Sequence, residues 1–581
     1  MINTSTIRIG LLASVCCVQM MVAQAQDKKI DFNGVGRALI TTGNYEGELQ
    51  KVDTITPNRE SQGHTLIDLR ADIFPNKETE ISAIMRFSNQ FGGFWGSGAN
   101  VQLRQLFARG VVADKLRYRV GDMYLQQTKY TLFNSDAETA TRFEPAAFSL
   151  YDDFINYENY YVDNQWRLQG GSMDFALQSE SVIKEVAFSG FLSANPGSIF
   201  FGNLKRLYGG GRVQVDQSEN LKFGLNYVNM FDLLGTATDS AQYVNAVSTF
   251  DFNYKREINS NLLLLVEGEL GNSRKVYNTS DTLAPAEVKD FFFDFGASVK
   301  LPKKGLNVGV TYRNVGAGFT SAGAQTRRVD YGMQGANFGI IHPNDLPEIR
   351  QARSVDINRD TSIYNRALQS ELMAYNTRYT LLNPYGRATP NRKGLTFAVD
   401  YNHPKKLLDA YAQFELLSEV VGEGTSIKRK FTGIEAGTQF HIHELIDWKK
   451  IIDVSASVYL QSSSRAQEDS AAAVDYNTML LDLGAAVEII DKLDLLLGLK
   501  VITASGTEYS RVATAPYLEV TDYPVYSLDD QEQLSALGLR YRFKENVSLS
   551  VQGQFFTFQD NVTAQRSYNM NQLLFFYNMN F

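Results

Sequence analysis

Apolar and polar residues alternate along most of the chain, in segments of roughly ten residues separated by turns. In FFFDFGASVKL (residues 291–301) every odd position is apolar, and the even positions include Asp294, Ser298 and Lys300. LNVGVTYRN (306–314) and VSLSVQGQF (547–555) follow the same pattern. A β-strand points successive side chains to opposite faces, so each segment has one apolar face and one mixed or polar face. The repetition predicts an all-β protein.

The connections between these segments alternate between short and long from residue 216 onward. No Pro-rich or Ser-rich linker divides the chain, so we expect one domain over residues 26–581. Short turns lie at 216–220, 255–261, 301–305, 402–406, 444–450, 490–493 and 543–546, and long polar loops lie near 232–246, 272–290, 316–393, 418–428, 463–477, 504–533 and 559–571. Outer-membrane barrels have short periplasmic turns and long external loops. The pattern therefore predicts a single transmembrane antiparallel β-barrel with a long loop insertion at 316–393.

The strand count follows from the same alternation. Twenty-three alternating segments would leave one terminus outside the cell, whereas single-chain bacterial barrels have an even number of strands. The odd count is resolved at residues 172–193, where we interpret the two segments SMDFALQ and VAFSGFLS as one long or bulged strand that crosses the membrane once. We therefore predict about 22 strands with both termini periplasmic, and 20 or 24 strands remain open.

Residues 1–25 have the pattern of a secretory signal peptide. Arg8 precedes a short apolar run, and Ala23-Gln24-Ala25 offers a cleavage site. A lipoprotein signal at Cys16 or Cys17 is the alternative. Both cysteines lie in this segment, so the mature chain would have no disulfide or catalytic thiol. Removal of residues 1–25 takes away Arg8 and no acidic residue, so the formal charge of the chain changes from −8 to −9. This negative charge argues against a nucleic-acid partner.

The chain ends in QLLFFYNMNF, with apolar residues at alternate positions up to the last residue. Leu573, Phe575, Tyr577 and Phe581 resemble the C-terminal signal of bacterial outer-membrane barrels, which implies insertion by the barrel assembly machinery. From residue 30 onward, including RVGDMY (119–124), the pattern resembles outer-membrane barrels of the Bacteroidota, in particular a family described only as a domain of unknown function. That resemblance implies the outer membrane and its lipid as surroundings, and it implies no enzymatic activity or cofactor.

The loop 316–393 contains ten basic and six acidic residues, a net charge of +4 on an acidic protein. One interpretation is an inward-folded constriction whose arginines attract anions. The other is an exposed loop that contacts glycolipid phosphates or a partner protein. The candidate pore or partner residues are Arg327, Arg328, Arg350, Arg353, Arg359 and Arg366.

The inward faces of the predicted strands carry charges of both signs, so no simple cation or anion filter is indicated. They include Asp251, Lys255, Glu267, Glu269, Asp294, Lys300, Arg313, Asp400, Asp409, Glu415, Lys500, Arg540 and Arg542. Such charges either coat a water-filled pore or join a plugged one through salt bridges. The sequence leaves both possibilities open.

Other chemical signals are weak. His441 and His443 share one face of an expected strand, but a zinc site needs at least a third ligand, so polar residues at the periplasmic rim are the expected interpretation. No G-x-S-x-G motif or cysteine nucleophile occurs in the predicted mature chain, which indicates that the protein is not an enzyme. Thr54, Ser240, Thr282 and Ser470 lie in Asp-Ser/Thr-apolar triplets that resemble Bacteroidota O-glycosylation acceptors.

Three functions fit these observations. The first is a porin-like passive channel for small solutes with a loop-narrowed polar lumen. The second is a non-conducting structural or accessory subunit of a surface or secretion complex. The third is a soluble secreted β-protein that binds polysaccharide. The sequence does not specify a substrate, an oligomeric state or a partner protein.

Overall fold

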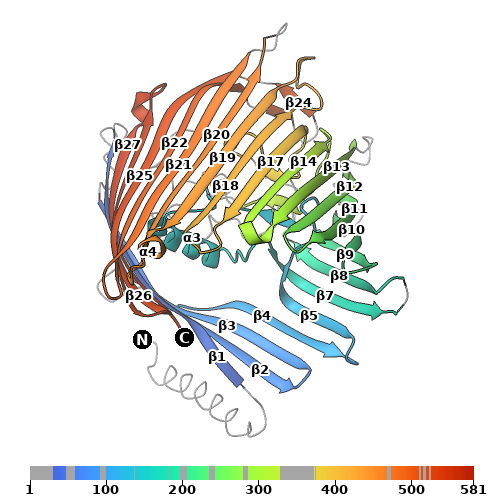
Figure 1. Ribbon diagram of the computed structural model, residues 1–581, viewed down its shortest axis with the longest axis horizontal. Coiled ribbons are helices and arrows are strands. Elements are labelled where there is room, and N and C mark those ends of the chain that lie inside the picture. The colour runs from blue at the N-terminus through green and yellow to red at the C-terminus, as the bar shows by residue number, and fades with distance from the viewer. Residues whose placement is uncertain are drawn as a thin grey trace, which may run out of the picture.

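The fold is a closed antiparallel β-barrel of 22 strands (Figure 1). Each barrel strand pairs with the next one along the chain, and the last strand pairs back with the first. The computed structural model describes residues 30–47, 59–91, 100–136, 138–180, 182–195, 206–233, 242–278, 286–327, 372, 375–467, 473–509, 512–514, 519–522 and 525–581. The predicted fold class and the strand number are confirmed.

The first half of the barrel consists of β1 (Ile30–Gly47), β2 (Arg59–Asn76), β3 (Thr79–Phe91), β4 (Asn100–Val112), β5 (Leu116–Leu125), β7 (Trp166–Gln178), β8 (Glu185–Asn195), β9 (Arg206–Asp216), β10 (Leu221–Asp232), β11 (Gln242–Asn259) and β12 (Leu262–Asn278). The second half consists of β13 (Ala286–Leu301), β14 (Leu306–Val315), β17 (Arg392–Asn402), β18 (Leu408–Ser418), β19 (Lys430–His441), β20 (Ile452–Arg465), β21 (Val474–Ile490), β22 (Leu493–Tyr509), β25 (Val525–Lys544), β26 (Val547–Asp560) and β27 (Tyr568–Asn580).

The smaller elements lie in the connections between barrel strands. They are β6 (Phe133–Ser135), α3 (Ala146–Glu158), η1 (Pro302–Lys304), β15 (Ala324–Thr326), β16 (Pro384–Arg387), α4 (Ile442–Leu445), β23 (Val512–Thr514), β24 (Glu519–Asp522) and η4 (Ala564–Arg566). No helix in the described residues is long and apolar enough to cross a membrane.

Short connections gather at the rim where β1 begins and β27 ends, which we call the terminal rim. Residues 77–78 join β2 to β3, and residues 491–492 join β21 to β22. At the far rim, by contrast, residues 126–165 join β5 to β7 and residues 316–391 join β14 to β17. The predicted sorting of connections is therefore present in the fold.

The interpretation of residues 172–193 as one crossing is wrong. β7 and β8 are two strands that pair antiparallel, with Gln178 opposite Glu185 across the short connection 179–184. The alternation continues on both sides of this connection, which made a single long strand plausible from the pattern alone. Because the total of 22 nevertheless holds, one of the other alternating segments in the count of 23 is not a barrel strand.

The outward face of the barrel is apolar, as β27 illustrates. Leu573 and Phe575 on its outward face are 40% and 39% exposed, whereas the inward Leu574 is 0% exposed. Large apolar side chains are exposed on strands all round the wall, for example Val101, Leu225 and Phe397. A closed barrel with this surface satisfies its backbone hydrogen bonds internally and presents hydrocarbon outward.

Candidate functional site

The barrel lumen contains two segments of chain that enter from the far rim. The first segment is formed by the described residues of 126–165, which include β6 and α3, and the second segment by residues 316–327 and 375–391, the two described stretches of the connection from β14 to β17. β6 and β15 pair in parallel, with Phe133 opposite Ala324, so the two segments contact each other. Figure 1 shows α3 inside the ring of strands.

The start of the first segment is anchored to β21 and β22. Lys500 Nζ lies 3.2 Å from Glu144 Oε1 and 3.5 Å from Asp482 Oδ2, and it donates a hydrogen bond to the carbonyl oxygen of Thr139. Thr141 donates to Asp482, and Arg142 pairs with Asp400. Burial raises the pKa of Glu144 well above its usual range; Asp152 adds to this effect, and Lys500 opposes it.

α3 lies against the inner wall through its apolar side chains. Pro145 precedes the helix at a position where a missing N–H costs nothing. Phe148 packs on β22 at Gly498, where a Cβ would come within 2.8 Å of the Phe148 ring, so glycine makes room for the helix. Phe154 meets Phe576 of β27 edge to face, with 4.1 Å between ring centroids. The apolar residues on the mixed face of β27 therefore pack against α3.

The end of α3 enters a buried cluster of charges on β1 to β4. Glu158 pairs with Arg37 and lies 2.6 Å from Arg86, while Asp68 lies 2.7 Å from both Arg86 and Arg104. Tyr157 donates a 2.6 Å hydrogen bond to Asp68. Burial alone would raise the pKa of Glu158, but the three arginines hold it well below the usual range.

The second segment is anchored by its arginines. Arg378 lies 2.6 Å from Asp530 of β25, and Arg387 lies 2.7 Å from Asp294 of β13. Asn383 donates to Glu415, which lies on β18. At the end of the segment, Arg392 donates to the carbonyl oxygens of residues 381 and 382 and lies 3.8 Å from the centroid of the Phe431 ring.

The two segments meet in an apolar cluster at the inner wall. The Tyr130 ring stacks on Phe292 with 3.8 Å between centroids, and its hydroxyl donates to Asp294, which also pairs with Arg387. Trp166 donates to the carbonyl oxygen of Gly323. Contacts between segments and wall therefore combine burial of aromatic rings with charged hydrogen bonds.

The predicted inward charges face the lumen, and most of those named have a partner. Asp251 pairs with Arg212, Arg540 with Asp494, and Arg542 with both Asp494 and Glu488. Arg313 is fully buried and donates to Asn383 of the second segment. Of the two possibilities left open by the sequence, this part of the lumen matches charges joined through salt bridges.

The predicted loop arginines are only partly within the described residues. Arg327 lies 3.7 Å from Asp136, and its guanidinium is 5.3 Å from the centroid of the Tyr161 ring. Arg328, Arg350, Arg353, Arg359 and Arg366 lie outside the described residues, as do the glycosylation candidates Thr54, Ser240, Thr282 and Ser470.

The two histidines do not share a strand face, which corrects the sequence prediction. β19 ends at His441, and His443 belongs to the short helix α4 at the terminal rim. His441 Nδ1 lies 2.7 Å from Asp453, and His443 Nδ1 lies 3.2 Å from the backbone of Ile452. In the described part of the chain, no group of three or more His, Cys, Asp or Glu residues could hold a metal ion.

The first segment is the functional element that the sequence prediction missed. Its helix carries an identifiable signal, because Pro145 precedes a stretch in which Ala147, Leu150 and Phe154 recur at helical spacing. The acids that anchor it, Glu144 and Glu158, have no sequence signature. Their partners come from strands far apart in the chain.

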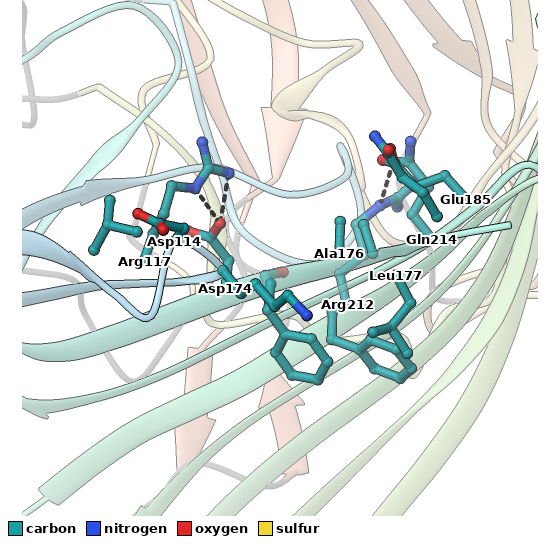
Figure 2. Close-up of a pocket in the computed structure, with 15 residues that line it drawn as sticks. Asp114, Arg117, Asp174, Ala176, Leu177, Glu185, Arg212 and Gln214 are labelled. Carbon is teal, nitrogen blue, oxygen red and sulfur yellow. Dashed lines mark hydrogen bonds and ion pairs between the residues drawn. The ribbon is translucent and has the colours of Figure 1, made fainter.

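The described part of the lumen retains a cavity of about 960 Å³ beside β5, β7, β8 and β9, near the terminal rim. Figure 2 shows Arg117 paired with Asp174 on one side and Arg212 beside Gln214 on the other. Asp114, Lys115 and Glu185 add further charges to the lining. The cavity is thus polar and of mixed sign.

Comparison with known proteins returns barrels of low similarity. Pseudomonas aeruginosa OccK5 (OpdH) is 8% identical, with 95% of this chain and 98% of that chain covered and a TM-score of 0.35. A BenF-like porin from Pseudomonas fluorescens Pf-5 is 9% identical, with 79% of this chain and 99% of that chain covered and a TM-score of 0.36. The outer membrane protein OprD from Pseudomonas aeruginosa is 10% identical, with 95% of this chain and 94% of that chain covered and a TM-score of 0.32. No protein family and no curated protein matches the chain. At these TM-scores the similarities carry no functional argument.

Proposed function

We propose that the protein is an outer-membrane barrel that conducts small polar solutes passively through a lumen narrowed by two inward-folded segments. The apolar outer face favours a lipid environment over a soluble polysaccharide-binding protein. The observation that carries the proposal is the lumen itself, in which charged side chains of both signs line a cavity of about 960 Å³ near the terminal rim. A polar lining admits hydrated solutes and disfavours apolar ones.

The anchors of the first segment favour gating over permanent closure. Glu158, which three arginines keep ionised, and Glu144, whose pKa burial raises, hold the two ends of residues 144–158, so the two ends respond differently to pH. A barrel that serves only as a scaffold gains little from such contacts, because buried ion pairs contribute little net stability compared with apolar packing. The non-conducting subunit is the second candidate, and the same experiment separates the two.

The test is planar-bilayer recording on the detergent-purified, refolded chain. The wild type should give small, intermittent conductance. A variant in which residues 138–164 are replaced by a short Gly-Ser linker should give larger, steadier conductance. Lys184→Gln, which alters only an exposed pair outside the cavity lining, should match the wild type. Absence of conductance from both wild type and linker variant, with barrel folding shown by heat-dependent gel mobility, would reject conduction and favour the scaffold.

The finer assignments belong to the same proposal. The terminal rim faces the periplasm, β27 is the strand read by the assembly machinery, and the chain is of the Bacteroidota type described only as a domain of unknown function. Its far-rim loops carry O-glycans at Thr54, Ser240, Thr282 and Ser470. Intact-mass measurement of the mature protein should show added hexoses, and a mass equal to that of the bare polypeptide would reject the glycans.

A further inference from the structure

The backbone ladder between β4 and β5 ends early. Only residues 107–112 of β4 pair with residues 116–121 of β5. Yet β4 stays paired with β3 as far as Asn100, and β5 stays paired with β7 as far as Leu125. Figure 1 shows the two strands converging at their turn and diverging away from it. We call residues 100–106 and 122–125 the seam.

The seam begins at a glycine with unusual backbone geometry. Gly121 has φ of +104°, and a Cβ there would meet the carbonyl oxygen of Leu106 at 2.3 Å. A side chain at this position would therefore collide with β4 and strain the backbone. This glycine lies in RVGDMY, the stretch noted in the sequence, and it lets β5 leave β4 at a fixed point.

Within the seam, side-chain hydrogen bonds and an ion pair replace the backbone hydrogen bonds between β4 and β5. Asp122 accepts a 2.7 Å hydrogen bond from the backbone N–H of Leu106, and Arg167 of β7 donates a 2.8 Å bond to the carbonyl oxygen of Arg104. Arg167 and Asp122 pair at 2.7 Å. In a bilayer, backbone polar groups require partners, and here side chains satisfy two of them. A seam joined by side chains can open without breaking a strand ladder.

The first segment supplies the wedge that fills the seam on its inner side. The Arg167 guanidinium lies 3.8 Å from the centroid of the Tyr160 ring, and Arg104 lies 4.6 Å from both the Tyr157 and Tyr160 rings. Tyr157 belongs to α3, and Tyr160 lies two residues after the end of the helix. The same segment that narrows the lumen therefore also closes the wall.

The two sides of the seam differ in polarity. Outside, Val101 and Leu103 are each 60% exposed, and Val120 is 58% exposed. Inside, the four guanidinium groups of Arg37, Arg86, Arg104 and Arg167 face the three carboxylates of Asp68, Asp122 and Glu158. The inner cluster thus has one more positive than negative charge, directly behind an aliphatic surface.

We infer that the seam is a lateral portal through which an anionic amphiphile with a long-chain carboxylate moves between the lumen and the surrounding bilayer. The carboxylate head group of the amphiphile replaces a protein carboxylate as hydrogen-bond partner of the arginines. Its alkyl chain lies along the aliphatic edge of β4 and extends into the lipid. The inference rests on the proposed outer-membrane location and not on conduction.

The test uses a long-chain carboxylate with a photoreactive group near its head, in proteoliposomes of the full mature barrel. A reducible bifunctional thiol reagent can join Leu106→Cys on β4 to Gln169→Cys on β7, since the two residues flank Asp122, which bonds to both, at two strand spacings or roughly 10 Å. The predicted mature chain has no other cysteine. Photolabelling of peptides that contain residues 157–160 should occur in the open protein, disappear after crosslinking and return on reduction. The control crosslink joins Leu225→Cys to Phe250→Cys in the fully paired β10–β11 ladder, and it should leave labelling unchanged.

Two results would overturn the portal. One is labelling at residues 157–160 that is equal before and after the seam crosslink, and the other is no labelling there in the uncrosslinked protein. A long-chain alcohol probe that labels as strongly as the carboxylate would reject the anionic class. Conductance recorded on the same samples separates this test from the channel proposal, since the crosslink should leave small-solute conductance in place.

Discussion

The two segments in the lumen are held by opposite arrangements of charge. Most anchors of the first segment are its own carboxylates, Glu144 and Glu158, which meet basic residues of the wall. The second segment contributes arginines, Arg378 and Arg387, which meet acids of the wall. The carboxylates of the first segment and the arginines of the second therefore select different parts of the inner wall, although Asp294 contacts both segments through Tyr130 and Arg387.

This difference explains how the described parts of the two segments take defined positions in a wide barrel. Apolar contacts alone, such as Phe154 on Phe576, do not specify which segment lies where, because non-directional burial fits many positions. Buried charges penalise every position that lacks a counter-ion. The anchors thus fix the register of each segment more than they stabilise the fold.

Glu158→Gln should have the largest effect, because it leaves Arg37, Arg86 and Arg104 facing one charge fewer in a buried site. We expect a loss of about 4–5 kcal/mol in the stability of the first segment's docking, the upper range for breaking a buried pair. The measurements are the midpoint of thermal unfolding in detergent and channel conductance. Unfolding should begin at lower temperature and conductance should rise. Unchanged values would mean that the cluster does not hold α3.

Arg378→Gln should have a smaller effect on the second segment, because it removes the charge partner of one acid, Asp530, whereas Glu158→Gln affects three arginines. About 3 kcal/mol is expected, the lower range for such a change. Limited proteolysis should then cut within residues 375–391 faster than in the wild type. Arg378→Lys keeps the charge and serves as the control, with partial recovery expected since lysine lacks the forked geometry. Equal protection of all three proteins would contradict this anchor.

The sequence predicts the wall far better than the lumen, for a physical reason. Alternation is a local property of each strand, so residues such as Leu573 and Phe575 can be assigned to the lipid face directly. The C-terminal strand, the sorted connections and the inward parity of Asp294 and Arg313 follow from the same local signal. The division at residues 172–193 fails because parity cannot distinguish a long strand from two strands with a short polar turn, and the shared face of His441 and His443 fails because β19 ends at His441.

The lumen depends on pairs distant in sequence. Glu158 lies 121 residues from Arg37, and Arg378 lies 152 residues from Asp530. No periodicity joins such residues. The arginine content of 316–393 does indicate that this loop needs acidic partners, whereas α3 offers only a helical pattern that is easily overlooked among strands.

The stabilisation contributed by Glu144 and that contributed by Glu158 should depend on pH in opposite directions. The pKa of Glu158 is lowered, so its stabilisation is present above pH 4.5 and is lost as pH falls through its folded-state pKa. The pKa of Glu144 is raised, so its contribution is present below pH 4.5 and is lost as pH rises through its folded-state pKa. Because Gln resembles a protonated Glu, both variants should match the wild type at acidic pH and differ from it as pH rises, with the thermal midpoint of Glu158→Gln below and that of Glu144→Gln above the wild-type value. Deviations of the same sign would contradict the assignment.

Asp174→Asn should have the smallest effect on stability, because the ion pair that it removes is exposed, unlike the buried pairs that hold the two segments. Its partner Arg117 is 72% exposed and its own side chain 38% exposed, so water screens the pair. We expect a change of less than about 1 kcal/mol in stability. The substitution does remove a negative charge from the cavity lining, so the reversal potential in a salt gradient should shift towards anion preference. A drop in thermal midpoint comparable with that of Glu158→Gln would mean that chemical identity of the pair, and not its removal from water, determines the strength of the anchors.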